Sequence, residues 1–187
     1  MQNPTRLKYY LLSSLFAALT AAGAFTKIPL PYVPITLQTF FVMLSGSLLG
    51  SKFGALSQII YLAVGLCGAP VFAYGGGPAY VLQPTFGYLL SYPIAAFVIG
   101  SLIEHRRERP SLTYLCLSNA VGVVLILTIG AAGLFLNLKF VVQNPISFGT
   151  LLTSYYLAFL PGDAIKMFVC AVATRKLIGV LDHERND

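Results

Sequence analysis

Asp163 and Lys166 are the two charged side chains that fall inside a long apolar stretch of this sequence. Three positions apart on a helix, they would share one face, so that a carboxylate acceptor and an ammonium donor meet there. A charged group in hydrocarbon is costly and is tolerated where it is paired or lines a polar cavity. The residues leave two alternatives open: a ligand site that uses both groups, or an internal ion pair with a structural role.

Pro161 and Gly162 stand directly before this pair. Proline has no N–H for the helical hydrogen bond and glycine weakens a helix further, which predicts a kink or break near this point. Counting about 1.5 Å per residue back from Arg175 places Lys166 about 13 Å and Asp163 about 18 Å from that boundary. The pair is therefore predicted near the middle of a membrane.

The composition is that of a membrane protein. Of 187 residues, 57% are hydrophobic and 10% are charged, whereas ordinary globular domains carry about 25% charged residues. The formal net charge of +6 is scattered between apolar runs and forms no continuous patch, so nucleic acid is not an expected partner. Cys67, Cys116 and Cys170 lie in apolar stretches without metal-ligand spacing, which indicates packing residues and no metal site.

The elements that must position the charged pair are long apolar segments. Six of them remain when the chain is cut at charges, prolines and glycine runs, at residues 9–26, 35–50, 55–72, 85–103, 112–138 and 148–174. All except the short second one approach or exceed the roughly 17 residues needed to cross a bilayer. The sequence therefore predicts an all-α integral membrane protein with six transmembrane helices, in which residues 1–187 form a single transmembrane substrate-binding domain.

Lysine and arginine residues in the connections predict the orientation, because cytoplasmic loops carry the excess of positive charge. With both termini in the cytoplasm, the outer side holds only Lys27 and Lys139. The inner side then holds nine basic residues: Arg6, Lys8, Lys52, Arg106, Arg107, Arg109, Arg175, Lys176 and Arg185. This asymmetry predicts a multi-pass protein of the cell membrane with cytoplasmic N- and C-termini.

The first apolar segment allows two readings. Its basic start, apolar run and small residues at 22–24 also resemble a cleavable signal peptide, and this alternative stays open. The same segment places Ala17, Ala18, Ala21 and Ala22 in two overlapping pairs at four-residue spacing, a pattern that lets another helix approach closely. These alanines could contact a partner protein or pack against the chain's own helices.

Residues 27–34 contain three prolines, which predict a stiff, non-helical segment that we call the strap. It could lie across an outward cavity as a lid, with Pro31, Tyr32 and Pro34 as lid residues and Tyr32 pointing into the cavity. A plain connection between helices is the alternative. Gln38 follows at the start of the second apolar segment, where it could reach a ligand or cap a helix.

A second loop on the same predicted side contains Gly75, Gly76 and Gly77. Consecutive glycines let backbone N–H groups approach a ligand closely, including an anionic one, although a flexible turn is an equal alternative. No Gly-Lys-Ser/Thr nucleotide-binding motif occurs in the sequence, so the chain shows no means of hydrolysing ATP. A second acid or activated nucleophile to accompany Asp163 is also not evident, and an enzyme is not expected.

Five motifs in order across the chain closely resemble the BioY family, the biotin-specific substrate-binding (S) components of energy-coupling factor (ECF) transporters. Gln83 and Phe86 depart from the family, which commonly has glycine at both places. Members often place a polar side chain in the glycine loop, where this chain has Tyr74 and backbone. The motifs are Val33-Pro34-x-Thr36-x-Gln38-Thr39, Gly65-x-x-Gly68-x-Pro70-Val71-Phe72, Gly75-Gly76-Gly77, Pro84-Thr85-x-Gly87-Tyr88-Leu89 and Gly162-Asp163-x-x-Lys166.

The resemblance implies high-affinity biotin binding, with no cofactor. Asp163 would accept from the ureido N–H groups of biotin while Lys166 donates to the ureido carbonyl. The alternative, in which the valerate carboxylate pairs with Lys166, leaves open which end of biotin lies deeper. The further binding candidates are Gln38, Tyr80, Tyr88, Asn119 and the backbone of Gly75, Gly76 and Gly77, the last three for the valerate end.

The resemblance also implies protein partners. In such transporters, small residues of the first helix contact a transmembrane coupling (T) subunit, which joins two cytoplasmic ATPases. Ala17 and Ala21, or the offset pair Ala18 and Ala22, are therefore the expected interface residues. The alternative function is a self-sufficient carrier or facilitator for a small molecule such as a vitamin, acting in the lipid bilayer without an ATPase module.

Overall fold

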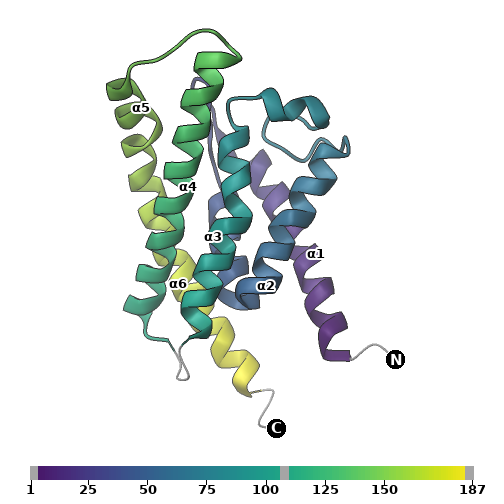
Figure 1. Cartoon of the computed structure of the whole chain (residues 1–187). Coiled ribbons are helices and arrows are strands. Elements are labelled where there is room, and N and C mark those ends of the chain that lie inside the picture. The colour runs from purple at the N-terminus through teal and green to yellow at the C-terminus, as the bar shows by residue number, and fades with distance from the viewer. Residues whose placement is uncertain (1–3, 106–109, 184–187) are drawn as a thin grey trace.

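The structure, a computed structural model, describes residues 4–105 and 110–183. Its helices pack as one bundle, and the first turn of α1 and the last turn of α6 lie at the same end of it (Figure 1). We call this the termini end and the opposite end, which carries the strap, the strap end. The long elements are α1 (Pro4–Phe25), α2 (Gln38–Leu66), α3 (Phe86–Glu104), α4 (Leu112–Phe140), α5 (Phe148–Tyr155) and α6 (Leu160–His183). The short ones are β1 (Lys27–Ile28), β2 (Ile35–Thr36), η1 (Pro78–Leu82) and η2 (Leu157–Phe159).

Within the described residues, five helical stretches are long and apolar enough to cross a membrane, where the sequence predicts six. The predicted segments 85–103 and 112–138 correspond closely to α3 and α4. The predicted segments 35–50 and 55–72 both fall largely in α2, which ends at Leu66. The last stretch, Phe148–Ile178, is built from α5, η2 and most of α6.

Helix α2 turns back on itself at Gly50, which has a left-handed backbone with φ 80°. Gln38 Nε2 donates to the Tyr61 hydroxyl at 2.7 Å, although these residues would lie about 34 Å apart on a straight helix. The carboxylate of Glu104 holds the turn, because its oxygens accept from the N–H and the hydroxyl of Ser51 at 3.0 and 2.6 Å. The two halves of α2 therefore run side by side in opposite directions.

The predicted break in the last apolar segment is present, and it begins slightly before Pro161. Tyr156 leaves helical geometry with φ −124° and ψ −65°, and η2 follows. Pro161 then lies in the first turn of α6, where the N–H that proline lacks would have no helical partner. Asp163 also lies in this first turn, where its negative charge interacts favourably with the helix dipole.

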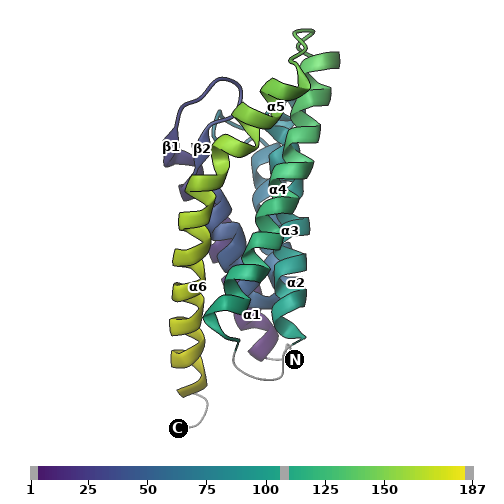
Figure 2. The ribbon, with the colours of Figure 1, turned by 90° about the vertical axis from the view of Figure 1, so that its left-hand side faces the viewer.

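The basic residues follow the predicted asymmetry as far as the structure describes them. Arg6 and Lys8 lie in the first turns of α1, Lys52 follows the turn of α2, and Arg175 and Lys176 lie towards the end of α6, all at the termini end. The two predicted outer lysines, in β1 and in the last turn of α4, lie at the strap end (Figure 2). Arg106, Arg107, Arg109 and Arg185 lie outside the described residues.

The bundle has α2, α3 and α4 at its centre, with α1 packed against α2 and α6 packed against α2 and α4. Helix α1 is an integral part of this packing, because Phe16 is buried in the core and the Ser13 hydroxyl donates to the Phe53 carbonyl at 3.0 Å. Helices α3 and α4 meet backbone to backbone where Gly87 faces Gly133.

Replacing Gly87 with alanine is expected to destabilise the protein by about 1–3 kcal/mol through overpacking. A Cβ at this position would lie 2.8 Å from Gly133 Cα, a backbone atom that cannot swing away. Gly149→Ala is the matched control, because both glycines are second in their helices and follow a phenylalanine, and a Cβ at Gly149 meets only Ser147 Oγ at 3.7 Å. Thermal unfolding in detergent should show a lower midpoint for Gly87→Ala alone; equal midpoints would contradict this packing.

Candidate ligand-binding site

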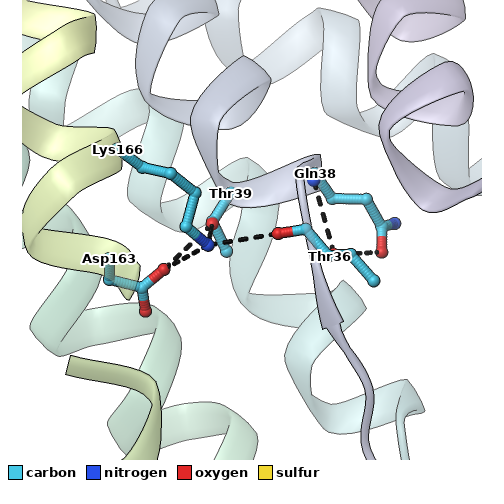
Figure 3. Close-up of polar contacts among 5 residues, drawn as sticks. All are labelled: Thr36, Gln38, Thr39, Asp163 and Lys166. Atoms are coloured by element: carbon cyan, nitrogen blue, oxygen red, sulfur yellow. Dashed lines mark hydrogen bonds and ion pairs between the residues drawn. The ribbon is translucent and has the colours of Figure 1, made fainter. Parts of the chain in front are cut away.

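The predicted pair of charges forms a direct ion pair inside the bundle. Lys166 Nζ lies 2.5 Å from Asp163 Oδ1, with 11% of the lysine side chain and 2% of the aspartate side chain exposed. Figure 3 shows both side chains leaving α6 towards the first turn of α2 and the strand before it. The i, i+3 spacing therefore brings the carboxylate acceptor and the ammonium donor together, as the sequence predicts.

Two threonines from the start of α2 and from β2 hold the pair in place. Lys166 Nζ donates to Thr39 Oγ1 at 2.6 Å and to the Thr36 carbonyl at 3.1 Å. The Thr39 hydroxyl donates to Asp163 Oδ1 at 3.2 Å. Both contacts engage Oδ1 of the Asp163 carboxylate, so that Oδ2 is the atom best placed to accept from a ligand.

A second layer of hydrogen bonds orients Gln38. The Thr36 hydroxyl donates to Gln38 Oε1 at 2.9 Å, and Gln38 Nε2 donates to the Tyr61 hydroxyl at 2.7 Å. The Tyr61 hydroxyl in turn donates to the Val71 carbonyl at 3.1 Å. Gln38 is buried, and its amide is held in one orientation at the cavity wall.

The ion pair lines a cavity of about 30 Å³ in the strap half of the bundle. Helices α2, α3, α4 and α6, together with the strap and η1, contribute to its walls. Its polar lining is Thr36, Gln38, Thr39, Thr85, Asp163 and Lys166, and its aromatic lining is Tyr80, Tyr88, Tyr92 and Phe159. An acceptor and a donor at one side of an aromatic chamber suit a small molecule with a polar head and an apolar body.

The cavity is smaller than the roughly 300–1,000 Å³ of sites that enclose a drug-sized ligand. A ligand of that size therefore requires a wall to move. The strap is the wall with the least regular structure, and its residues Val33 and Pro34 line the cavity. This arrangement gives the strap the position expected of a lid.

The three predicted lid residues occupy different places. Pro34 is buried in the cavity wall and Pro31 is exposed. Tyr32 was predicted to point into the cavity, but the structure turns it across the strap end. Its backbone is left-handed with φ 62°, its hydroxyl accepts from Asn144 Nδ2 at 3.0 Å, and its ring centroid lies 6.2 Å from that of Tyr155. Tyr32 thus fastens the strap to the opposite side of the bundle.

Gly75, Gly76 and Gly77 do not line the cavity. The Gly75 N–H donates to the Phe72 carbonyl at 3.2 Å, and the Gly77 N–H donates to the Gly65 carbonyl at 2.7 Å. The glycines close a compact turn in this way. The sequence-based prediction that their N–H groups hold an anion is therefore not supported by this geometry, because two of the three donors are already used.

Tyr80 and Tyr88 line the cavity as predicted, and each is fixed by a hydrogen bond. The Thr85 hydroxyl donates to the Tyr80 oxygen at 3.0 Å, and the Tyr88 hydroxyl donates to the Tyr155 carbonyl at 2.9 Å. Tyr80 lies outside the membrane-spanning helices, and burial raises the pKa of its hydroxyl above the ordinary value. Tyr80 therefore stays neutral and able to donate to a ligand at physiological pH.

Asn119 is not at the cavity. It is fully buried in α4, about 10 Å along the helix from the lining residue Ile126, and its Oδ1 accepts from Ser47 Oγ at 3.1 Å. Sequence reasoning missed Tyr92, which lines the cavity one helical turn after Tyr88. The four-residue spacing of the two tyrosines is the signal that would have found it.

The alanine pairs of α1 face in different directions. Ala17 is 6% exposed and belongs to the core, and Ala21 is partly buried against that core. Ala18 and Ala22 are exposed on the outside of the bundle. The pair left free to meet another helix is therefore Ala18 and Ala22.

Comparison with known proteins places this chain in a family. The sequence model of the BioY family matches residues 1–183. The probable biotin transporter BioY of Lysinibacillus sphaericus is 49% identical over 129 residues, which cover 69% of this chain and 65% of that relative. The biotin transporter BioY of Thermotoga maritima is 36% identical over 174 residues, covering 91% of this chain and 96% of that protein.

A solved structure matches the whole bundle. The crystal structure of the S-component for biotin from an ECF-type ABC transporter superimposes with a TM-score of 0.80 at 31% sequence identity, covering 96% of this chain and 95% of that one. The chain belongs to the BioY family.

Proposed function

We propose that this chain captures biotin with high affinity and takes part in its uptake as the membrane-embedded S component of an ECF-type vitamin transporter. The observation that carries the proposal is the buried Asp163–Lys166 pair at one side of an aromatic cavity. Family membership supports transport and not catalysis. The choice of biotin as the ligand rests on relatives that are named as biotin transporters.

The chemistry of biotin fits this cavity. Its ureido head has two N–H donors and one carbonyl acceptor, and its thioether ring is apolar. Asp163 Oδ2 is proposed to accept from one of the ureido N–H groups, while Lys166 donates to the ureido carbonyl and neutralises Asp163. Tyr80 and Tyr88 form walls for the ring, and Gln38 supports the head from the start of α2.

The proposed topology has six spans in the cell membrane. Each half of α2 would cross, since the chain reverses at Gly50, and both termini would then lie on the cytoplasmic side. The basic residues described at the termini end support this orientation. The strap end would face outward and the strap would act as the lid.

Energy for uptake would come from partners. A transmembrane coupling (T) subunit and two cytoplasmic ATPases are proposed to join this chain, which has no nucleotide-binding motif of its own. Ala18 and Ala22 are the proposed contact with the T subunit, because they form the exposed pair on α1. A self-sufficient facilitator is not favoured; biotin uptake by the chain alone in liposomes would revive it.

Titration of the purified protein with a panel of vitamins tests the ligand directly. Biotin is expected to bind, and desthiobiotin, which keeps the ureido group and the acid but lacks the thioether ring, should bind about tenfold more weakly because less apolar surface is buried. Thiamine and riboflavin should not bind. Isothermal titration calorimetry provides the measurement. If the protein does not bind biotin, the proposal is wrong.

A further inference from the structure

Lys27 lies at the strap end with its ammonium group beside the cavity wall. Its Nζ donates to the Ala73 carbonyl at 2.5 Å and lies 4.8 Å from the ring centroid of Tyr74. Ala73 itself lines the cavity. A lysine has three N–H donors, and the bond to Ala73 uses one of them.

The strand pairing sets the direction of this side chain. Lys27 is directly opposite Thr36 in the β1–β2 ladder, and opposite residues of an antiparallel pair project from the same face, about 5 Å apart. Thr36 lines the cavity, and its carbonyl accepts from Lys166 Nζ at 3.1 Å. The two lysines therefore flank one strand pair. Lys166 lines the cavity, and Lys27 bonds the lining residue Ala73, at a part of the wall that we call the rim.

Within the part of the chain that the structure describes, the strap end offers Lys27 no carboxylate partner. The segments that close this end, residues 26–37, 67–85 and 141–147, contain no acidic residue. The six acidic residues of the sequence are Glu104, Glu108, Asp163, Asp182, Glu184 and Asp187. Among the described residues, Asp163 is the acid at the cavity, and Lys166 already neutralises it. Among the described residues, Lys27 therefore brings a positive charge to the rim without a carboxylate counter-ion.

We propose that Lys27 binds the carboxylate of the ligand, so that an elongated acid lies with its polar head at Asp163 and Lys166 and its acid end at the rim. The proposal rests on the proposed function and adds the contact that the glycine turn does not supply, since the N–H groups of Gly75 and Gly77 are used internally. Lys27 belongs to the strap and contacts the loop at Ala73, so the same contact would hold the strap closed over a bound acid.

The test compares biotin with biotinamide, which has a neutral amide in place of the carboxylate. Calorimetric titrations would use the full-length protein and two variants, Lys27→Gln and Lys139→Gln. Lys139 is the matched control, because it also lies at the strap end and its ammonium also lies near an aromatic ring, 5.2 Å from the Phe140 ring centroid. Neither lysine is itself a lining residue, but Lys27 bonds the carbonyl of the lining residue Ala73.

Lys27→Gln is expected to weaken biotin binding about tenfold, the effect of one charge-assisted hydrogen bond, and to change biotinamide binding by less than about twofold. Lys139→Gln should change neither. If Lys27→Gln weakens the binding of biotin and of biotinamide equally, the proposal is overturned, because Lys27 would then only connect the strap to the loop at Ala73. Unchanged biotin binding would overturn it as well. If the unaltered protein binds neither ligand, the proposed function itself fails.

Discussion

Asp163→Asn is expected to weaken biotin binding by at least about a hundredfold, which corresponds to about 2.7 kcal/mol. The Asp163 carboxylate accepts from Lys166 and Thr39, and the residue is buried. Its loss removes the proposed acceptor for a ureido N–H and also leaves the Lys166 ammonium buried without its counter-charge. Lys166→Met should have an effect of similar size, because it removes the donor and leaves the buried Asp163 carboxylate without its counter-charge.

Glu104→Gln is the matched control for this pair of variants. It also neutralises a carboxylate that accepts from a side-chain hydroxyl, here that of Ser51, but at the termini end, where Glu104 holds the turn at Gly50. Biotin affinity should stay unchanged, even if thermal stability falls. Titration calorimetry with thermal unfolding of the ligand-free protein separates binding from folding. Full affinity in both Asp163→Asn and Lys166→Met would mean that the ion pair is structural and the ligand lies elsewhere.

The double variant Ala18→Trp/Ala22→Trp is expected to abolish energy-coupled biotin uptake while leaving biotin affinity within about twofold of the original. Both side chains are exposed on α1, so bulky rings there need not disturb the bundle but would prevent close approach of a partner helix. Uptake would be measured in proteoliposomes or cells that contain the T subunit and both ATPases, and affinity on the isolated protein.

Two further variants test whether the effect belongs to the exposed face of α1. Leu117→Trp places the same ring on an exposed position of α4, and it should leave uptake intact if the effect belongs to one face of α1. Ala17→Trp should instead lower the thermal midpoint, because Ala17 is packed in the core and overpacking destabilises by about 1–3 kcal/mol. Normal uptake by the double variant would remove α1 as the partner interface.

Local chemistry made part of the site predictable. The meeting of Asp163 and Lys166 depends only on helical periodicity, and the break before them depends on proline and glycine. The apolar segments were equally predictable from the sequence, since a helix in lipid must carry apolar side chains over most of its length. Helices α3 and α4 accordingly begin and end within about two residues of their predicted segments.

Contacts between distant parts of the chain were harder to predict. Thr36 and Thr39 reach Lys166 across 130 and 127 positions, and no local pattern states that they hold its ammonium group. The glycine turn shows the same limit: three glycines permit an anion-binding loop, but the Gly65 carbonyl, supplied by α2, takes the Gly77 N–H. Tyr32 likewise turns away from the cavity because Asn144 offers its hydroxyl a partner.

Composition and spacing alone established a membrane-embedded helical protein with one buried pair of charges, because hydrophobicity and helical periodicity are properties of neighbouring residues. Packing determined which residues surround that pair and which face of α1 is free. A helix that is apolar on all sides has no hydrophobic stripe to show its orientation, so the choice between Ala17 and Ala18 followed only from the docking of α1 on α2. The position of Lys27 depended in the same way on strand pairing, which places Lys27 opposite Thr36 and its ammonium on the carbonyl of the lining residue Ala73.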